Sequence, residues 1–279
     1  MGTSASSKGS PGNVPMVPPW VPAAPADPVA PEDGTDDAKA DDAPVDPATV
    51  TAPPAAPPVA HSGRFTGARL NLGNFAGNGE PAAMRRGVGQ YFKSGYGGGT
   101  TAARRFGGTA QTAGGLFGAL TPGGVGPAAP DRSVLGGRSA DEIMDAVVEA
   151  VRPIDGTQDG EASRAAIRDA LSDLLEQFPE ADLLNLDDTQ RQFAVERFVA
   201  LDVFRRLQLD LGKTIQDKAP TILAAMARLK EVREYVKETV AESFRQLRAA
   251  GTRLAAGVVT RVVQAAVGEA ITVFESYVQ

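Results

Sequence analysis

The sequence contains no cysteine and a single histidine, His61. Without cysteine the chain forms neither disulfides nor thiolate metal sites, and it offers no cysteine nucleophile. One histidine gives no second imidazole for a zinc site and no plausible general base for a serine nucleophile. The chain also lacks the Gly-x-Ser-x-Gly and Gly-x4-Gly-Lys-Ser/Thr signatures. We therefore expect no catalytic residue, no metal and no cofactor, and hence a protein that is not an enzyme.

Long uncharged apolar runs are also missing. The most apolar stretch, Leu254 to Tyr277, is interrupted by Arg261, Glu269 and Glu275. A bilayer span needs about 18–20 apolar residues, so we expect no stable membrane insertion. Membrane association through the last helix is the alternative, but Arg261 and Glu269 disfavour it. The start of the chain has no signal-peptide core, and the lack of cysteine suits a reducing cytosol, so we predict a cytoplasmic protein.

Glycine and proline are abundant, with 31 and 21 residues, and most of them precede Gly137. Residues 1–62 combine recurring prolines with eight acidic residues and two lysines. Prolines remove backbone donors, acids repel one another, and few apolar groups offer compensation, so this segment is predicted to be a disordered, Pro-rich acidic tail. At roughly 3 Å per extended residue it can hold the N-terminus tens of Å from a folded domain.

Residues 63–106 carry the opposite charge, because Glu80 is their only acid. Short helices are expected at about 80–93 and 100–106, separated by glycines at 95 and 97–99. The glycine run before Thr100 is either a phosphate cradle at a helix N-terminus or a flexible hinge, and we favour the hinge. Arginines interleaved with aromatics suit phosphate contacts and base stacking in DNA or RNA, but they equally suit docking on an acidic protein surface or on the chain's own tail. The candidate binding residues are Arg64, Arg69, Arg85, Arg86, Lys93, Arg104 and Arg105.

Residues 107–137 are again rich in glycine and proline and are predicted to be a linker. Residues 138–279 have helical periodicity, so the fold class is mainly α, with one folded domain of about 140 residues. We expect a C-terminal bundle of about five helices, beginning with a capping box at Ser139 and Glu142. The third helix is predicted to run from about 189 to 211 with Gly212 as its C-cap. The last two, from Pro220 and from Thr252, are predicted to be joined by a short turn into a long antiparallel hairpin. The last helix has an apolar stripe broad enough for burial or for homo-oligomer contacts.

The extreme N-terminus is the second feature with functional content. Because Gly2 is small, we expect removal of Met1 and exposure of a free glycine amine on the tail. Ser6 also completes a myristoylation pattern, but one acyl chain anchors a protein only weakly. The alternative is an ordinary start followed by a small residue.

These motifs, taken in order, resemble the QatB family. The opening Met1-Gly2-Thr3-Ser4 is similar to the start of that family, and a Pro-rich lead ends in Pro18-Pro19-Trp20. Further along come Arg64-Phe65-Thr66-Gly67-Ala68-Arg69, then Arg85-Arg86 and Ala102-Ala103-Arg104-Arg105. The resemblance covers residues 1–110 by motif and the remaining helices only in style, with no matched motif after Ser139.

The resemblance implies a component of the Qat anti-phage defence system, which also contains an ATPase, a QueC-like enzyme and a TatD-like nuclease. It implies that the QueC-like enzyme attaches a deazaguanine group to Gly2, with Thr3 and Ser4 in the recognised tail. The chain would then be an adaptor, and its C-terminal helices would serve for docking or oligomerisation. The competing hypothesis is a nucleic-acid-binding module acting through residues 63–106.

Overall fold

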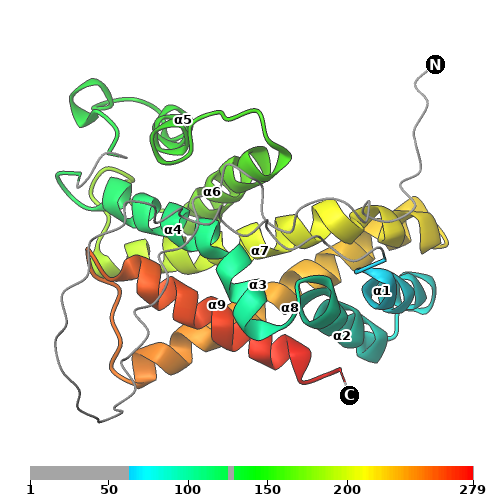
Figure 1. Ribbon diagram of the computed structural model, residues 1–279. Helices are drawn as coiled ribbons and strands as arrows, with labels where there is room; N and C mark the ends of the chain where they lie inside the picture. Colours follow the sequence, from blue (N-terminus) through cyan, green and yellow to red (C-terminus); the bar gives the residue numbers. More distant parts are fainter. Residues whose placement is uncertain (1–62, 125–128, 279) are drawn as a thin grey trace, which may run out of the picture. The chain divides into compact units, whose positions relative to one another are not determined.

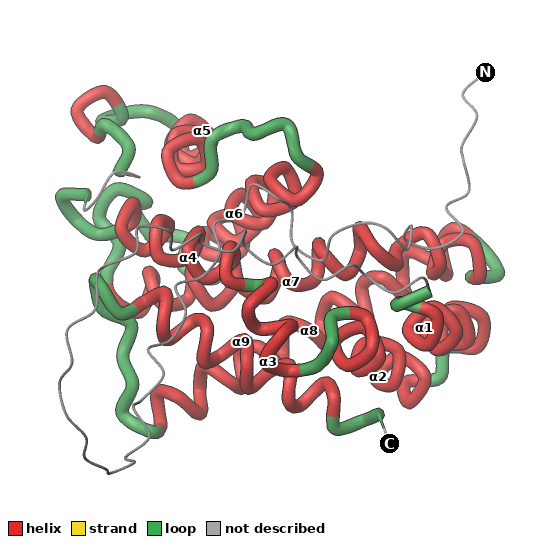
Figure 2. The backbone as a smooth tube through the Cα atoms, viewed as in Figure 1, coloured by secondary structure: helices red, strands yellow, loops and turns green. Residues whose placement is uncertain are grey.

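The computed structural model describes residues 63–124 and 129–278, and every regular element among them is helical (Figures 1 and 2). Residues from Arg64 onward form one compact unit. The predicted acidic tail, with Gly2, Thr3 and Ser4, lies outside the described residues. The mainly α fold class is confirmed for the described part of the chain.

The helices follow one another with short connections. In chain order they are α1 (Thr66–Asn78), α2 (Pro81–Gln90), a π-helical turn η1 (Tyr91–Gly95), α3 (Gly99–Arg105), α4 (Gly107–Leu120), a 3-10 turn η2 (Arg132–Val134), α5 (Ala140–Val151), α6 (Gln158–Gln177), α7 (Asp188–Lys218), α8 (Ile222–Ala249) and α9 (Val259–Glu275).

Two helices organise the packing. The long helix α7 contacts α1, α4, α6 and α8, while α9 contacts α2, α3, α4 and α8 (Figure 1). The buried side chains of these helices belong to a single apolar core. Its largest fully buried side chains include Tyr91, Phe75, Phe92 and Phe106, all from residues 64–106.

Local sequence signals set several helix starts, one of them as predicted. Ser139 accepts a hydrogen bond from the Glu142 amide, and the Glu142 carboxylate accepts one from the Ser139 amide, so the predicted capping box at the start of α5 is confirmed. Asp187 and Gln190 form the same reciprocal pair at the start of α7. Thr157 and Thr221 cap α6 and α8 through their hydroxyl oxygens.

The predicted end of the third C-terminal helix is wrong. Helix α7 continues through Gly212 to Lys218, and Gly212 is buried inside it. A glycine in a helix interior costs about 1 kcal/mol relative to alanine, and burial of Leu211 and Ile215 on either side of it offsets that cost. The helix ends at Ala219, whose extended conformation (ψ 144°) is the one that the following Pro220 favours.

The last two helices are also joined differently from the prediction. Helix α9 begins at Val259, so nine residues, Ala250 to Val258, separate it from α8 rather than a short turn. Gly251 and Gly257 have positive φ angles of 85° and 82°, which fit this longer, irregular connection. Helices α8 and α9 do pack together, but the tight connection lies between α7 and α8, at Ala219–Thr221.

The prediction of a linker over residues 107–137 is wrong for its first half. Residues 107–120 form α4, which buries Leu116, Phe117 and Leu120 in the core. Its glycines permit close approach to α9, because a Cβ at Gly114 would lie 2.8 Å from the Thr260 hydroxyl. Further along, Arg132 donates to the carbonyls of Ala119 and Thr121 at 2.9 and 2.7 Å and so closes the loop.

Residues 63–106 likewise belong to the helical unit and not to a separate segment. The helices expected near 80–93 and 100–106 are present as α2 with η1 and as α3. Helix α1 was not predicted, because its glycines and asparagines have low helix propensity. It forms because Leu72 and Phe75 are fully buried against the neighbouring helices.

Candidate functional site

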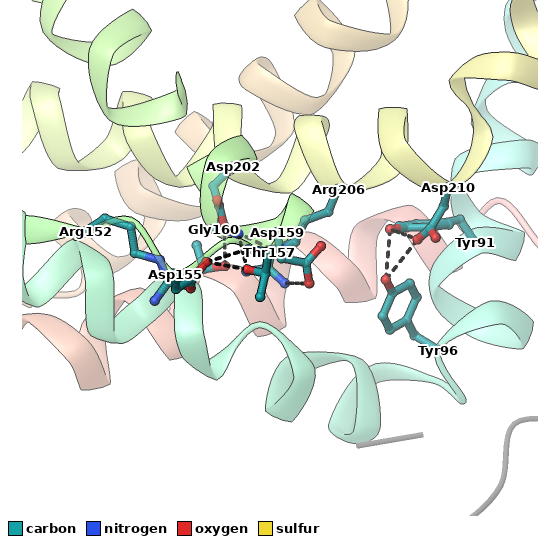
Figure 3. Close-up of polar contacts among 11 residues, drawn as sticks. Tyr91, Tyr96, Arg152, Asp155, Thr157, Asp159, Gly160, Asp202, Arg206 and Asp210 are labelled. Atoms are coloured by element: carbon teal, nitrogen blue, oxygen red, sulfur yellow. Dashed lines mark hydrogen bonds and ion pairs between the residues drawn. The ribbon is translucent and has the colours of Figure 1, made fainter. Parts of the chain in front are cut away.

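A row of charged side chains crosses the apolar bundle along one face of α7. Asp202, Arg206 and Asp210 are spaced four residues apart, so they lie on one side of the helix. Asp202 is fully buried, and Arg206 and Asp210 are half-buried. Figure 3 shows the three side chains in a row, with Tyr91 and Tyr96 at the Asp210 end. Buried charges require partners, so we take this row and its contacts as the candidate site.

The π-helical turn η1 aims two phenols at Asp210. The Tyr96 amide donates to the Tyr91 carbonyl at 3.1 Å, the i to i+5 pairing of a π turn, and this pairing brings the two tyrosines to the same side. Both hydroxyls donate to Asp210 Oδ2, at 2.9 Å from Tyr91 and 3.0 Å from Tyr96. The two phenol oxygens are themselves 3.2 Å apart.

The environment fixes the protonation of this trio. Burial raises the pKa of both Tyr91 and Tyr96, and the Asp210 carboxylate raises them further, so both phenols stay protonated and act as donors. Burial also raises the pKa of Asp210, although the two phenol hydrogen bonds and the charge of Arg64 act in the opposite direction.

Arg64 and Phe65, close to the start of the described residues, pack against the two tyrosines of this trio. Phe65 is 2% exposed and stacks on Tyr91, with ring centroids 5.4 Å apart. The Arg64 guanidinium lies 4.5 Å from the Phe65 ring centroid and 6.0 Å from that of Tyr96. We call Arg64, Phe65, Tyr91, Tyr96 and Asp210 the root clasp, because they fix the residues that directly follow positions 1–62.

A second polar group lies at the other end of the row. Thr109 of α4 donates to Asp202 Oδ2 at 2.5 Å, and Arg206 Nε donates to the same oxygen at 3.2 Å. Arg206 also reaches Asp159 at 3.4 Å and lies 5.6 Å from the Phe106 ring centroid. Burial lowers the pKa of Arg206, but the carboxylates of Asp202 and Asp159 more than offset this and raise it. Thus a hydrogen bond to α4 and an ion pair to α6 hold α7 in place, in addition to apolar packing.

Comparison with protein-family models matches residues 97–274 to QatB, described as Qat anti-phage system associated protein QatB. The chain belongs to the QatB family. The match includes the row on α7 and begins at Gly97, just after Tyr96 of the root clasp. It also covers the helices after Ser139, where motif reading found no resemblance. No curated protein and no solved structure matches the chain.

The cations predicted to bind a partner do not gather at one point in this family member. Arg105 lies 5.1 Å from the Tyr96 ring centroid, beside the root clasp. Arg85 lies over Tyr277 at 5.5 Å, and Lys93 donates to the Val278 carbonyl at 2.9 Å. Arg86 contacts Asn71 and Glu80, while Arg104 is exposed and Arg69 half-buried. Arg64 and Arg105 thus lie in or beside the root clasp, while Arg85 and Lys93 lie against the C-terminal residues Tyr277 and Val278.

The aromatics expected to stack on bases are inside the bundle. Phe65, Tyr91, Phe92 and Phe106 are at most 2% exposed, and Phe92 stacks on Phe274 of α9 at 5.1 Å. The base-stacking part of the sequence prediction is therefore wrong for these rings. The apolar alternation in residues 63–106 reflects core packing, because Phe92 stacks on Phe274 of α9 and Phe106 lies against Arg206 of α7.

The glycine run at 97–99 forms a tight turn. Gly97 and Gly98 have φ angles of 83° and 85°, a conformation that favours glycine. A Cβ at Gly99 would lie 3.8 Å from Glu275 Oε2, so a carboxylate lies close to the start of α3. This carboxylate disfavours phosphate at the start of α3.

Sequence reasoning missed Asp202, Arg206 and Asp210. A signal was present, because these charges recur every fourth residue within a helix whose other inward positions are apolar. Within residues 63–124 and 129–278, no group of three His, Cys, Asp or Glu side chains is placed to hold a metal ion. In the same residues, no helix is long and apolar enough to cross a membrane.

Proposed function

We propose that this protein is a non-catalytic adaptor of the Qat anti-phage defence system and that its N-terminal glycine, Gly2, is a modification acceptor. In this proposal a QueC-like partner attaches a deazaguanine group to the Gly2 amine, with Thr3 and Ser4 read as part of the tail. The ATPase and the TatD-like nuclease of the same system would dock on the helical body. Membership of the QatB family supports the role in the system.

The root clasp is the observation that carries the adaptor role. Phe65 and Arg64 pack on the rings of Tyr91 and Tyr96, whose hydroxyls are in turn bound to Asp210 of α7, so the chain enters the bundle at a fixed point. About 60 residues precede that point, enough to carry a reactive amine tens of Å. A long Pro-rich acidic tail that is fixed to the helical unit at Arg64 and Phe65 suits delivery of Gly2 into the active site of another protein.

The helical body suits the role of scaffold. One oxygen of each of the two acids on α7 is engaged in structural hydrogen bonds: Asp202 Oδ2 with Thr109 and Arg206, and Asp210 Oδ2 with the two tyrosines. Carboxylates engaged in this way hold helices together and are poorly placed for proton transfer to a substrate.

Phage protection tests the proposal. Cells that carry the complete system with Gly2→Pro, which removes the primary amine, are expected to lose protection while the circular dichroism spectrum and melting temperature of the protein stay unchanged. Gly9→Pro, a matched change within the tail, is expected to keep protection. Full protection with Gly2→Pro would refute the acceptor role.

The alternative is nucleic-acid binding through the exposed cations of α2, η1 and α3. Glu80 is the only acid among residues 63–124, which favours a polyanionic partner. With the rings buried, such binding would rest on phosphate contacts alone and would fall steeply with salt. Replacing Arg85, Arg86 and Arg104 by Ala would abolish it, and Arg253→Ala, a change at an exposed cation after α8, would not. Unchanged affinity in the triple variant would exclude this alternative.

A further inference from the structure

The first turn of α8 carries large apolar side chains that the core does not use. Ile222 is 82% exposed, Leu223 78% and Met226 63%. Farther along the same helix, the large apolar side chains of Val232, Val236 and Val240 are fully buried. The three large apolar side chains of the first turn are thus exposed, while those farther along belong to the core. Exposed apolar side chains that cluster in this way mark interaction sites more often than scattered ones do.

These three side chains share one narrow face. At about 100° per residue, Ile222, Leu223 and Met226 fall within an arc of about 100°, and Lys230 lies in the same arc two turns further on. The face is at the connection between α7 and α8, at the right of the view in Figure 1. We call Ile222, Leu223 and Met226 the α8 tip.

The α8 tip is built on a fixed helix start. The Thr221 hydroxyl accepts a hydrogen bond from the Ala224 amide at 3.0 Å and caps the helix. On the inward side, Ala225 is buried, and Arg228 lies 5.3 Å from the Phe75 ring centroid while it pairs with Glu231. Because its inward side is packed against the body, this helix turn is already formed before a partner binds. Binding through the outward side chains therefore costs little conformational entropy of the backbone.

The surroundings of the tip are cationic. Lys218 and Lys230 are exposed, and neither forms an ion pair with an acid in residues 63–124 or 129–278. No acid occurs in α8 before Glu231, and Asp217 is paired with Lys213 at 2.9 Å. A partner that covers the apolar side chains must therefore accept unpaired positive charge beside them.

We infer that the α8 tip docks into a partner protein that has an apolar groove rimmed by Asp and Glu side chains. Met226 follows Ile222 by four residues and Leu223 by three, and these are the spacings of the anchors of a helix seated in such a groove. A second copy of this chain is a poor occupant, because two tips in contact would bring Lys218 and Lys230 against their own copies. A membrane surface is also a poor occupant, because interfacial helices use a long apolar face and this one spans little more than one turn. The inference concerns the body and is independent of the modification of Gly2.

Site-specific photocrosslinking tests the docking. A benzophenone amino acid at position 223, in the full-length protein expressed with the complete gene neighbourhood, is expected to give an adduct with one other protein. The crosslinked peptide should contain apolar and acidic residues. The same crosslinker at Leu70, which is 65% exposed on α1, is the matched control and should give no such adduct.

Reversing the charges beside the α8 tip distinguishes specific docking from nonspecific hydrophobic association. Lys218→Glu with Lys230→Glu is expected to reduce the adduct at position 223 at least tenfold, and Arg253→Glu is expected to leave it unchanged. An adduct with the mass of two copies of this chain would overturn the proposal, as would no adduct at all. Flotation with phosphatidylcholine and phosphatidylglycerol vesicles that is lost in Ile222→Gln, Leu223→Gln, Met226→Gln would overturn it in favour of a membrane.

Discussion

Tyr96 and Asp210, which are 114 positions apart in the chain, are joined by a hydrogen bond of 3.0 Å between the phenol and Oδ2. The bond joins the end of the π-helical turn to the C-terminal third of α7, the longest helix of the described residues. Because Tyr91 donates to the same oxygen, both tyrosines fix the position of the turn relative to the helix. This contact adds to the apolar packing of α1, α2 and α3 on α7 and α9.

Removing the phenol hydroxyl should weaken the unit measurably. Tyr96→Phe is expected to lower the free energy of unfolding by about 1 kcal/mol, the usual net value of a hydrogen bond. Asp210→Ala should cost more, about 1–3 kcal/mol, because it leaves two buried phenol donors without their acceptor. Urea denaturation of the full chain measures both. The control is Tyr277→Phe, whose ring is 41% exposed. Equal stability of all variants would show that the root clasp does not hold the fold.

The pH dependence of stability should carry the signature of Asp210. Burial raises the pKa of this carboxyl in the folded state above its ordinary value of 3.8. The folded state therefore binds the proton more tightly than the unfolded state, and this contribution to stability is lost as the pH rises through the folded-state pKa. The difference in unfolding free energy between the native chain and Asp210→Asn should thus shift in favour of the native chain as the pH falls from neutral toward 4. A difference that is flat with pH, or that shifts the other way, would contradict the assignment.

Glycines at the contact between α2 and α9 should be sensitive to a single methyl group. A Cβ at Gly89 would lie 2.5 Å from the Phe274 carbonyl oxygen, and backbone cannot move aside easily. Gly89→Ala is therefore expected to destabilise the protein by about 1–3 kcal/mol. At Gly268 of α9 nothing lies within 4 Å of the added atom, so Gly268→Ala should stabilise by up to about 1 kcal/mol. Thermal melting of both variants checks the pair, and a stabilising Gly89→Ala would show that α2 and α9 do not approach this closely.

The sequence predicted the C-terminal helices well where capping and apolar periodicity agreed. The capping box at Ser139 and Glu142 and the long α8 are examples. It failed at α4, because local propensity treats glycine as a helix breaker, while Gly114 allows α4 to approach α9 closely. Such contacts join residues far apart in the chain, so no local window contains the information.

The candidate site was predictable only in part. The sequence identified Arg64, Arg85 and Arg105 as cations beside aromatics. A local pattern could not show that Arg64 packs on the ring of Phe65 and Arg105 on the ring of Tyr96. The carboxylate that orders the clasp, Asp210, lies more than 100 residues further along the chain. Membership of the QatB family was suggested by motifs before residue 110, and the family match lies mostly after them.

The mass of the N-terminal peptide is the most direct test of the proposed function. The protein is purified from cells with the complete Qat system and from cells that lack the QueC-like partner, and each N-terminal peptide is measured. The account predicts loss of Met1 in both samples and an added deazaguanine-sized mass on Gly2 only when the partner is present. An unmodified glycine in both samples would contradict it and would leave the basic surface of α2, η1 and α3 as the leading site.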